Sequence, residues 1–230
     1  MSAGPVRNPR RHFSDTFTGA VNISRDDHKS VPFESLLEQD WLIRTDAFDR
    51  DLRSIVAQPM EVKYRFDGKT RIWIPDFLRV RKGPVGRQDP PADLVEVKPL
   101  ISVYSDHPDE EVRERDQAYV AAKFEAIRMQ TLALGYEFVL ATENEIRIEP
   151  SLRNASLMLR CADRAFPKKW ERVGELAVVS LPRSSSIREL ERALPEGVDG
   201  FSVALRLAWK GQIVLDPGEN WTRATTFARV

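Results

Sequence analysis

The chain has 230 residues, of which 42% are hydrophobic and 30% are charged, as in globular proteins that bury a core. Its 35 Lys and Arg residues balance its 35 Asp and Glu residues, so the net charge neither indicates nor excludes a nucleic-acid partner. No apolar run reaches the roughly 18 residues of a membrane span, and the first residues lack the apolar stretch of a signal peptide. We therefore expect a cytoplasmic protein with no membrane partner.

The N-terminal part predicts a flexible arm followed by a helix. Residues 1–29 are polar, contain glycine and proline, and show no sustained periodicity. A helix should begin near Ser30, which can cap it. Apolar side chains then recur at helical spacing, at Phe33, Leu36, Leu37 and Trp41.

Three extended segments should follow this helix. The first covers 54–59, and a second at 61–66 returns through Asp67-Gly68 into a third at 69–80. Asp-Gly between two alternating segments is typical of a two-residue β-hairpin turn. The sequence therefore predicts a hairpin at this point.

A loop rich in glycine and proline follows the hairpin at 82–93, and the next strand covers 94–99. Acidic residues after Asp106 and an apolar stripe predict a long helix that ends at Gly135. Two short strands should follow, at 136–143 and 145–149. This order of helices and strands predicts the α/β class, with a mixed sheet flanked by helices.

The pattern changes after residue 150. Two helices over 151–178 precede a helix that the serines at 184–186 can cap, and a further helix and a terminal hairpin end the chain. Helices followed by a terminal hairpin are the outline of a small winged-helix-like domain. We therefore expect three parts: the arm at 1–29, a main domain at 30–150 and the winged-helix-like domain at 151–230.

The strand at 94–99 should carry two charged side chains on one face. Because strand side chains alternate, Glu96 and Lys98 project together, opposite to the valines beside them. Asp76 follows Pro75 in the sequence IWIPDF, where the proline ends the regular pairing of the preceding strand. We expect the carboxylate of Asp76 to lie beside that of Glu96.

Two carboxylates and an ammonium group at one point suit phosphodiester hydrolysis. Neighbouring carboxylates repel each other unless a cation lies between them. Mg²⁺, or Mn²⁺ in its place, prefers oxygen ligands and keeps waters that can attack phosphorus. Lys98 would orient or deprotonate that water, or offset charge on the transition state.

Glu34 is the candidate third ligand, because it borders the apolar stripe of the expected first helix. The alternative is a glutamate that merely stabilises the first turn of that helix. The predicted catalytic residues are thus Glu34, Asp76, Glu96 and Lys98, and the first three of them are the predicted metal ligands.

A basic stripe precedes this strand. Residues 63–87 hold eight basic side chains against two acidic ones, namely Lys63, Arg65, Lys69, Arg71, Arg79, Arg81, Lys82 and Arg87 against Asp67 and Asp76. The stripe either faces phosphate groups or is a solvated surface of a neutral protein.

Four segments, FESLLEQD, IPDF, LVEVKP and GYEFVLATENEIR, in this order resemble the TnsA-type endonuclease subunit of heteromeric, Tn7-like transposases. The resemblance covers about 30–150 and implies the PD-(D/E)xK restriction-endonuclease fold there. The helix glutamate of the family falls on Glu34, its metal-binding aspartate on Asp76 and its lysine on Lys98. Some members carry glutamine where this chain has Glu96. Gln58 also resembles a family feature, but its chemistry assigns it no role.

The resemblance implies a Mg²⁺-dependent DNA endonuclease that cuts the 5′ ends of a transposon, while a separate transposase of the DDE type cuts the 3′ ends. It also implies contact with an AAA+ ATPase regulator and a winged-helix-like domain after the nuclease. Two alternatives stay open. One is a stand-alone nuclease of the same fold for repair or restriction, and the other is a non-catalytic module that binds DNA or serves as a scaffold.

Overall fold

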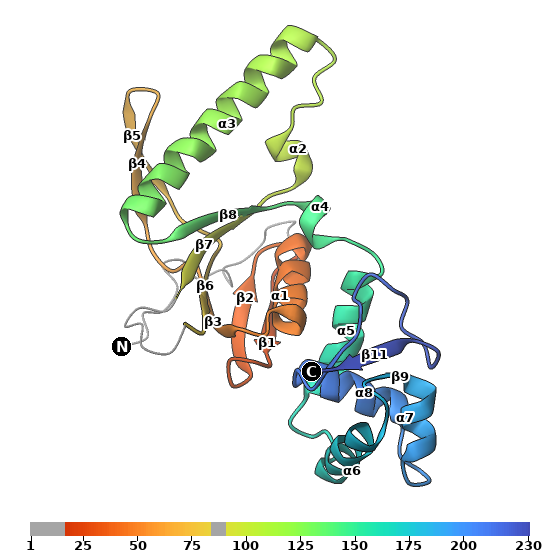
Figure 1. The fold of residues 1–230 in the computed structure, drawn as a ribbon. Helices are drawn as coiled ribbons and strands as arrows, with labels where there is room; N and C mark the ends of the chain where they lie inside the picture. The colour runs from red at the N-terminus through yellow and green to blue at the C-terminus, as the bar shows by residue number, and fades with distance from the viewer. Residues whose placement is uncertain (1–16, 84–90) are drawn as a thin grey trace. The chain divides into compact units, whose positions relative to one another are not determined.

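The computed structural model describes residues 17–83 and 91–230 (Figure 1). The first 16 residues of the expected arm lie outside the described residues, as do most of the expected loop and Arg87 of the basic stripe.

The described chain forms two compact units. Unit 1 contains the described residues up to Leu42 and Asp51–Ile146, and unit 2 contains Ile43–Arg50 and Arg147–Val230. Helix α1, Leu36–Phe48, therefore contributes residues to both units. This division differs from the expected one at residue 150, because a segment from the first fifty residues packs into the C-terminal core.

A four-stranded mixed sheet is the centre of unit 1. Its strands in spatial order are β3 (Leu52–Ala57), β6 (Phe77–Arg81), β7 (Ala92–Val97) and β8 (Glu137–Ala141). Strand β6 runs antiparallel to both β3 and β7, whereas β7 and β8 are parallel. The predicted class, a mixed sheet flanked by helices as in restriction endonucleases, is confirmed.

Alternation along β7 separates two cores. Val95 shares one core with Phe77 of β6 and Trp41 of α1, whose rings stack with their centres 4.8 Å apart. Leu94 instead packs in a second core with Ile127 of helix α3 (Glu110–Ala133). Neighbouring residues of the strand thus point to opposite faces, as the sequence predicts.

Two antiparallel hairpins accompany this sheet. They are β1–β2, formed by Gly19–Ile23 and Lys29–Phe33, and β4–β5, formed by Val62–Phe66 and Lys69–Trp73. Asp67 and Gly68 connect β4 to β5 with positive φ angles of 52° and 67°. Positive φ at both central residues is what a two-residue hairpin turn requires, so the Asp-Gly prediction is confirmed.

The start of the first helix was predicted wrongly. Ser30 lies in β2, and α1 begins only at Leu36. The Ser35 hydroxyl accepts a 3.1 Å hydrogen bond from the Glu38 amide, and the Glu38 carboxylate accepts one of 2.8 Å from the Glu34 amide. These bonds satisfy amide groups that the first turn leaves unpaired, so the chain becomes helical five residues later than expected.

In unit 1, two helices lie between β7 and β8 in the chain, and a third follows β8 (Figure 1). The long helix α3 is capped by Asp109 and confirms the predicted helix, whereas the short helix α2, Leu100–Val103, was not expected. Helix α4, Glu143–Ile146, replaces the strand expected at 145–149. The Glu145 carboxylate accepts hydrogen bonds from the amide and hydroxyl of Thr142, and these bonds stabilise a helical turn.

Unit 2 is built from four helices besides the end of α1, and from a small sheet. Its elements are α5 (Ser151–Ala162), α6 (Lys168–Ser180), β9 (Ser184–Ser186), α7 (Ile187–Ala193), α8 (Gly200–Trp209), β10 (Ile213–Val214) and β11 (Thr226–Arg229). The strands are antiparallel in the order β10-β11-β9. Ser186 and Glu189 form a capping box at α7. The sequence predicted the helices and the terminal strands, and the structure adds β9, which pairs with β11.

Unit 2 has an apolar core, and its helices are short or amphipathic. Within residues 17–83 and 91–230, no helix combines the length and the apolar character that crossing a membrane would require.

Candidate active site

Strand register places Asp76 opposite Glu96. Phe77 pairs with Val95 where β6 and β7 run antiparallel. Continuing this register by one residue sets Asp76, just before β6, against Glu96, near the end of β7. Directly opposed residues of antiparallel strands have neighbouring side chains, so this register explains why the two carboxylates meet.

Backbone contacts on both sides hold Asp76. Its Oδ2 accepts a 2.7 Å hydrogen bond from the Val97 amide, and its carbonyl oxygen accepts one of 2.9 Å from the Gln58 amide. The residue is therefore tied to β7 through its side chain and to the end of β3 through its backbone. Pro75, which has no amide hydrogen, separates this position from β5, which belongs to a different sheet.

Lys98 bridges the two carboxylates. Its Nζ lies 2.9 Å from Oε1 of Glu96 and 3.5 Å from Oδ2 of Asp76. The second oxygen of Glu96 accepts a 2.7 Å hydrogen bond from Nε1 of Trp73, and Glu96 is only 6% exposed. The structure thus brings together three of the four predicted site residues, and Trp73 is a neighbour that the sequence did not indicate.

The electrostatics of the cluster favour a bound cation or proton. Burial, together with the negative charges of Glu96 and Glu38, raises the pKa of Asp76 to about 7, against the opposing effects of Lys98 and the Val97 amide. Burial lowers the pKa of Lys98, but the two carboxylates beside it outweigh burial and raise that pKa overall. Lys98 is therefore an ammonium group at neutral pH, whereas Asp76 is only partly ionised there, because its negative charge costs free energy in this environment.

Glu38, and not Glu34, brings a carboxylate of α1 within electrostatic range of the cluster. Burial raises the pKa of Glu38, its hydrogen bonds to the Glu34 amide and the Ser35 hydroxyl lower it, and its charge interacts with Asp76 and Lys98. Glu34 precedes the helix rather than lying on it. Among the described residues, its carboxylate has no hydrogen bond or ion pair with the three clustered side chains. Ser35 and Glu38 are three residues apart, the spacing of a capping box, and this spacing is the sequence signal for Glu38 in the first turn of α1.

Gln58 is a further neighbour whose conformation is unusual. It has a positive φ of 45° at the end of β3 and is 5% exposed. Its side-chain Oε1 is buried and has no hydrogen-bond partner within the described residues. Gln58 is thus a strained, buried polar residue, and its backbone amide helps to hold Asp76 in place.

The donor set fits a hard divalent cation. Two carboxylates lie side by side, and the repulsion between them raises the pKa of Asp76, which a cation would relieve. In the described ranges, no group of three or more His, Cys, Asp or Glu side chains is arranged to hold a metal. Mg²⁺ is commonly held by only one or two carboxylates and keeps several waters, so two carboxylates are enough protein ligands for it.

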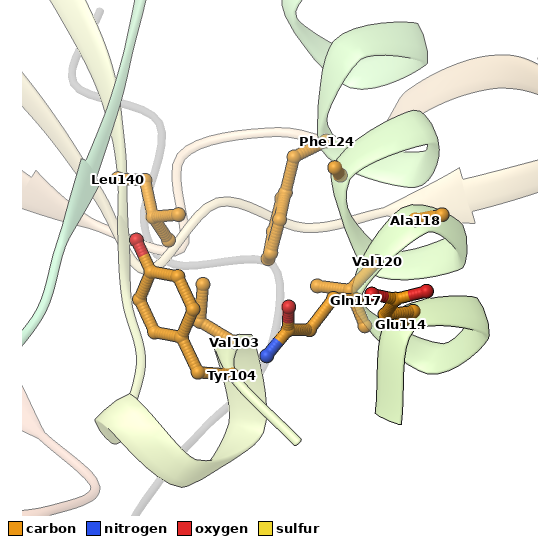
Figure 2. A pocket seen from close by; sticks show the side chains of 9 residues that line it. Val103, Tyr104, Glu114, Gln117, Ala118, Val120, Phe124 and Leu140 are labelled. Atoms are coloured by element: carbon orange, nitrogen blue, oxygen red, sulfur yellow. The ribbon is translucent and has the colours of Figure 1, made fainter. Parts of the chain in front are cut away.

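A hollow in unit 1 is separate from this cluster. A cavity of about 520 Å³ lies between α2, α3 and β8, and Figure 2 shows Tyr104, Phe124 and Leu140 around it. None of the clustered side chains lines it. Its lining is mostly apolar and contains one charged side chain, Glu114, so it lacks the cluster of charged groups that hydrolysis requires.

A comparison with protein families identifies the part of the chain that holds the cluster. The family model described as TnsA-like endonuclease N terminal matches residues 49–143. This segment is a TnsA-like endonuclease domain. No curated protein matches the chain.

The TnsA-like match confirms the resemblance seen in the sequence. It contains Gln58, Trp73, Asp76, Glu96 and Lys98, so the three clustered charges and their two neighbours all lie in the endonuclease domain. A TnsA-like domain implies DNA as the substrate and a transposase as the partner. Glu34 and Glu38 precede the matched segment.

Proposed function

We propose that the protein is a Mg²⁺-dependent DNA endonuclease that cleaves the 5′ ends of a transposon within a heteromeric transposase. The observation that carries the proposal is the opposition of Asp76 and Glu96 across β6 and β7, bridged by Lys98 inside a TnsA-like endonuclease domain. The partners we propose are a DDE-type transposase and an AAA+ ATPase regulator.

Asp76 and Glu96 would hold Mg²⁺, or Mn²⁺ in its place, and Glu38 would add negative charge from α1. The bound cation supplies Lewis-acid activation of a phosphate oxygen and of a water. Asp76 is positioned for this by the amides of Val97 and Gln58, and Glu96 by the indole of Trp73.

The sequence allows Lys98 to orient a water, to deprotonate it or to offset charge on the transition state, and we propose the last of these roles. Because the carboxylates raise its pKa, its amine is protonated at neutral pH and cannot serve as a general base in this state. We assign it to neutralising negative charge on the phosphate as the transition state forms. Substrate phosphate would then replace part of its present contact with the carboxylates.

The test is strand nicking at transposon ends by the full-length protein, reconstituted with its partner subunits and Mg²⁺. Asp76→Asn and Lys98→Ala should each abolish nicking while the protein stays folded. Asp163→Asn in unit 2, an exposed aspartate with no link to the cluster, should nick as the wild type does. Undiminished nicking by either cluster variant would contradict the proposal and favour the module that only binds DNA or serves as a scaffold.

A stand-alone repair or restriction nuclease is distinguished by the same reconstitution. The proposal requires that nicking be confined to transposon ends and depend on the transposase subunit. Nicking of arbitrary duplexes without any partner would instead favour the stand-alone enzyme.

A further inference from the structure

The β4–β5 hairpin is a two-stranded ribbon with one covered and one open face. Val62 pairs with Trp73 and Tyr64 with Arg71, and this side of the ribbon packs toward α3. The Phe66 ring meets the Tyr119 ring of α3 edge to face, with 5.0 Å between their centres. Figure 1 shows the ribbon beside α3 and beyond the four-stranded sheet.

The open face of the ribbon is basic. Alternation places Lys63, Arg65, Thr70 and Ile72 together on it, since Lys63 pairs with Ile72 and Arg65 with Thr70. All four residues are exposed, and Ile72 is 57% exposed. An exposed isoleucine between cations is more typical of a contact surface than of a purely solvated one.

The structure divides the basic stripe of the sequence into two classes. Arg79 and Arg81 both bind the buried carboxylate of Asp93, at 2.6 and 2.8 Å, so their charges are satisfied inside the protein. Lys63 and Arg65, by contrast, have no hydrogen bond or ion pair from their side chains anywhere in the described part of the chain. These two cations remain available to an external anion.

The remaining charges of the ribbon do not cancel this surface. Lys69 is exposed near the turn, and Arg71 lies over the Phe66 ring and 3.9 Å from Asp67. Asp67 and Glu61 are the two acidic residues, at the turn and at the base of the ribbon. Between these ends, the open face carries only positive charge.

The base of the ribbon is joined to the catalytic cluster. Trp73, the last residue of β5, donates its indole hydrogen to Glu96. Lys69, at the other end of β5, is four residues away, or about 13 Å at roughly 3.3 Å per residue. Phosphates of one DNA strand follow each other at about 3.4 Å along the helix axis, so the ribbon spans about four base pairs.

We propose that the open face of the β4–β5 ribbon binds the phosphate backbone of duplex DNA next to the cleaved bond, through Lys63 and Arg65. This inference rests on the proposed function, because the cut must occur at the cluster that Trp73 joins to the ribbon. The ribbon aligns the duplex so that the scissile phosphate reaches Asp76, Glu96 and Lys98. It contributes affinity without reading sequence, since phosphate contacts carry no base information.

The experiment measures binding of the full-length protein to a fluorescent 30-base-pair duplex in chelator, so that no cleavage occurs, between about 50 and 200 mM salt. Each lost phosphate contact should reduce the slope of log K against log salt by about 0.9. The double variant Lys63→Ala/Arg65→Ala should therefore lose about 1.8 of slope. The matched control is Arg115→Ala/Arg128→Ala on exposed positions of α3, which removes the same charge and should leave the slope unchanged.

The outcomes separate this inference from the proposed function. Equal slopes for the ribbon variant and the control, or no binding by the wild type at 50 mM salt, would overturn the ribbon inference even if the wild type nicks transposon ends. A reduced slope together with undiminished nicking by Asp76→Asn would instead overturn the proposed catalytic cluster and keep the ribbon as a DNA contact. Both alanines replace exposed side chains, so unchanged thermal melting should show that the fold is intact.

Discussion

Trp73 fixes one oxygen of Glu96 through a buried 2.7 Å hydrogen bond from its indole nitrogen. Replacing Trp73 by Phe should leave a buried carboxylate oxygen without a partner, which costs about 1–3 kcal/mol of unfolding free energy. Nicking should fall about 10- to 100-fold, because a group that orients a metal-binding carboxylate is lost. Urea unfolding and nicking rates measure the two effects.

Trp221→Phe is the matched control for Trp73→Phe. The Trp221 indole donates to the backbone carbonyl of Asp216 in unit 2, so its loss should lower stability without lowering nicking. Equal nicking losses in both variants would mean that Trp73 acts only through overall stability.

Asp76 should make the metal-free protein less stable as pH rises. Its folded pKa of about 7 lies above the ordinary value of 3.8, so its contribution to stability is complete below pH 4 and is lost as pH rises toward 7. The variant Asp76→Asn cannot ionise at this position. At pH 8 it should melt at a higher temperature than the wild type, with an unfolding free energy larger by on the order of 2–4 kcal/mol. The two proteins should melt alike near pH 4, and a constant difference at all pH values would contradict the shift.

Mg²⁺ should raise the melting temperature of the wild type at pH 8, since a ligand that binds only the folded state stabilises it. Asp76→Asn should show little or no such rise, because one of the two carboxylates is then neutral. Melting followed by circular dichroism over a Mg²⁺ titration, with Ca²⁺ in parallel, measures this effect without any nicking. An equal rise in both proteins would place the cation elsewhere.

Glu38 and Glu34 can be separated by paired substitutions. Glu38→Gln keeps the hydrogen-bonding shape of the capping box but removes the charge, so the helix should persist while nicking falls on the order of 10- to 100-fold. Glu34→Gln removes the same charge four residues earlier and should nick within about twofold of the wild type. The reverse ranking would restore the ligand expected from the sequence.

Gly174 allows a test of packing in unit 2. A Cβ at this position of α6 would collide with Cγ1 of Val203 on α8. This collision should cost about 1–3 kcal/mol of unfolding free energy. The roughly 1 kcal/mol by which alanine favours a helix over glycine offsets only part of that cost, so Gly174→Ala should destabilise the protein. Thermal melting measures the loss, and Gly218→Ala, whose Cβ would meet only Asp216 Oδ1 at 3.2 Å, should change little.

Local sequence rules predicted the parts of the fold that short-range chemistry decides. The Asp-Gly turn follows from two backbone angles, and the shared face of Glu96 and Lys98 follows from strand alternation. The proximity of Asp76 to Glu96 was also predictable, because Asp76 lies just before β6 and Glu96 lies near the end of the antiparallel strand β7.

The errors concern choices that tertiary contacts decide. Apolar residues in β2 can satisfy helical spacing as well as strand alternation, and only the pairing with β1 selects the strand. The error moved the helix start, so the expected helix included Glu34, which in the structure precedes α1. Trp73 was not indicated by the sequence and Gln58 was given no role, because their contacts are hydrogen bonds to residues distant in sequence.

The division of α1 between two cores has a consequence for synthesis of the chain. Ala47 at its end packs with Ala155, Val203 and Phe227, which leave the ribosome more than a hundred residues later. At about 5–20 residues per second, the end of this helix waits several seconds or longer for its packing partners. The endonuclease unit can therefore close its sheet first, and unit 2 becomes complete only when the last strand has been made.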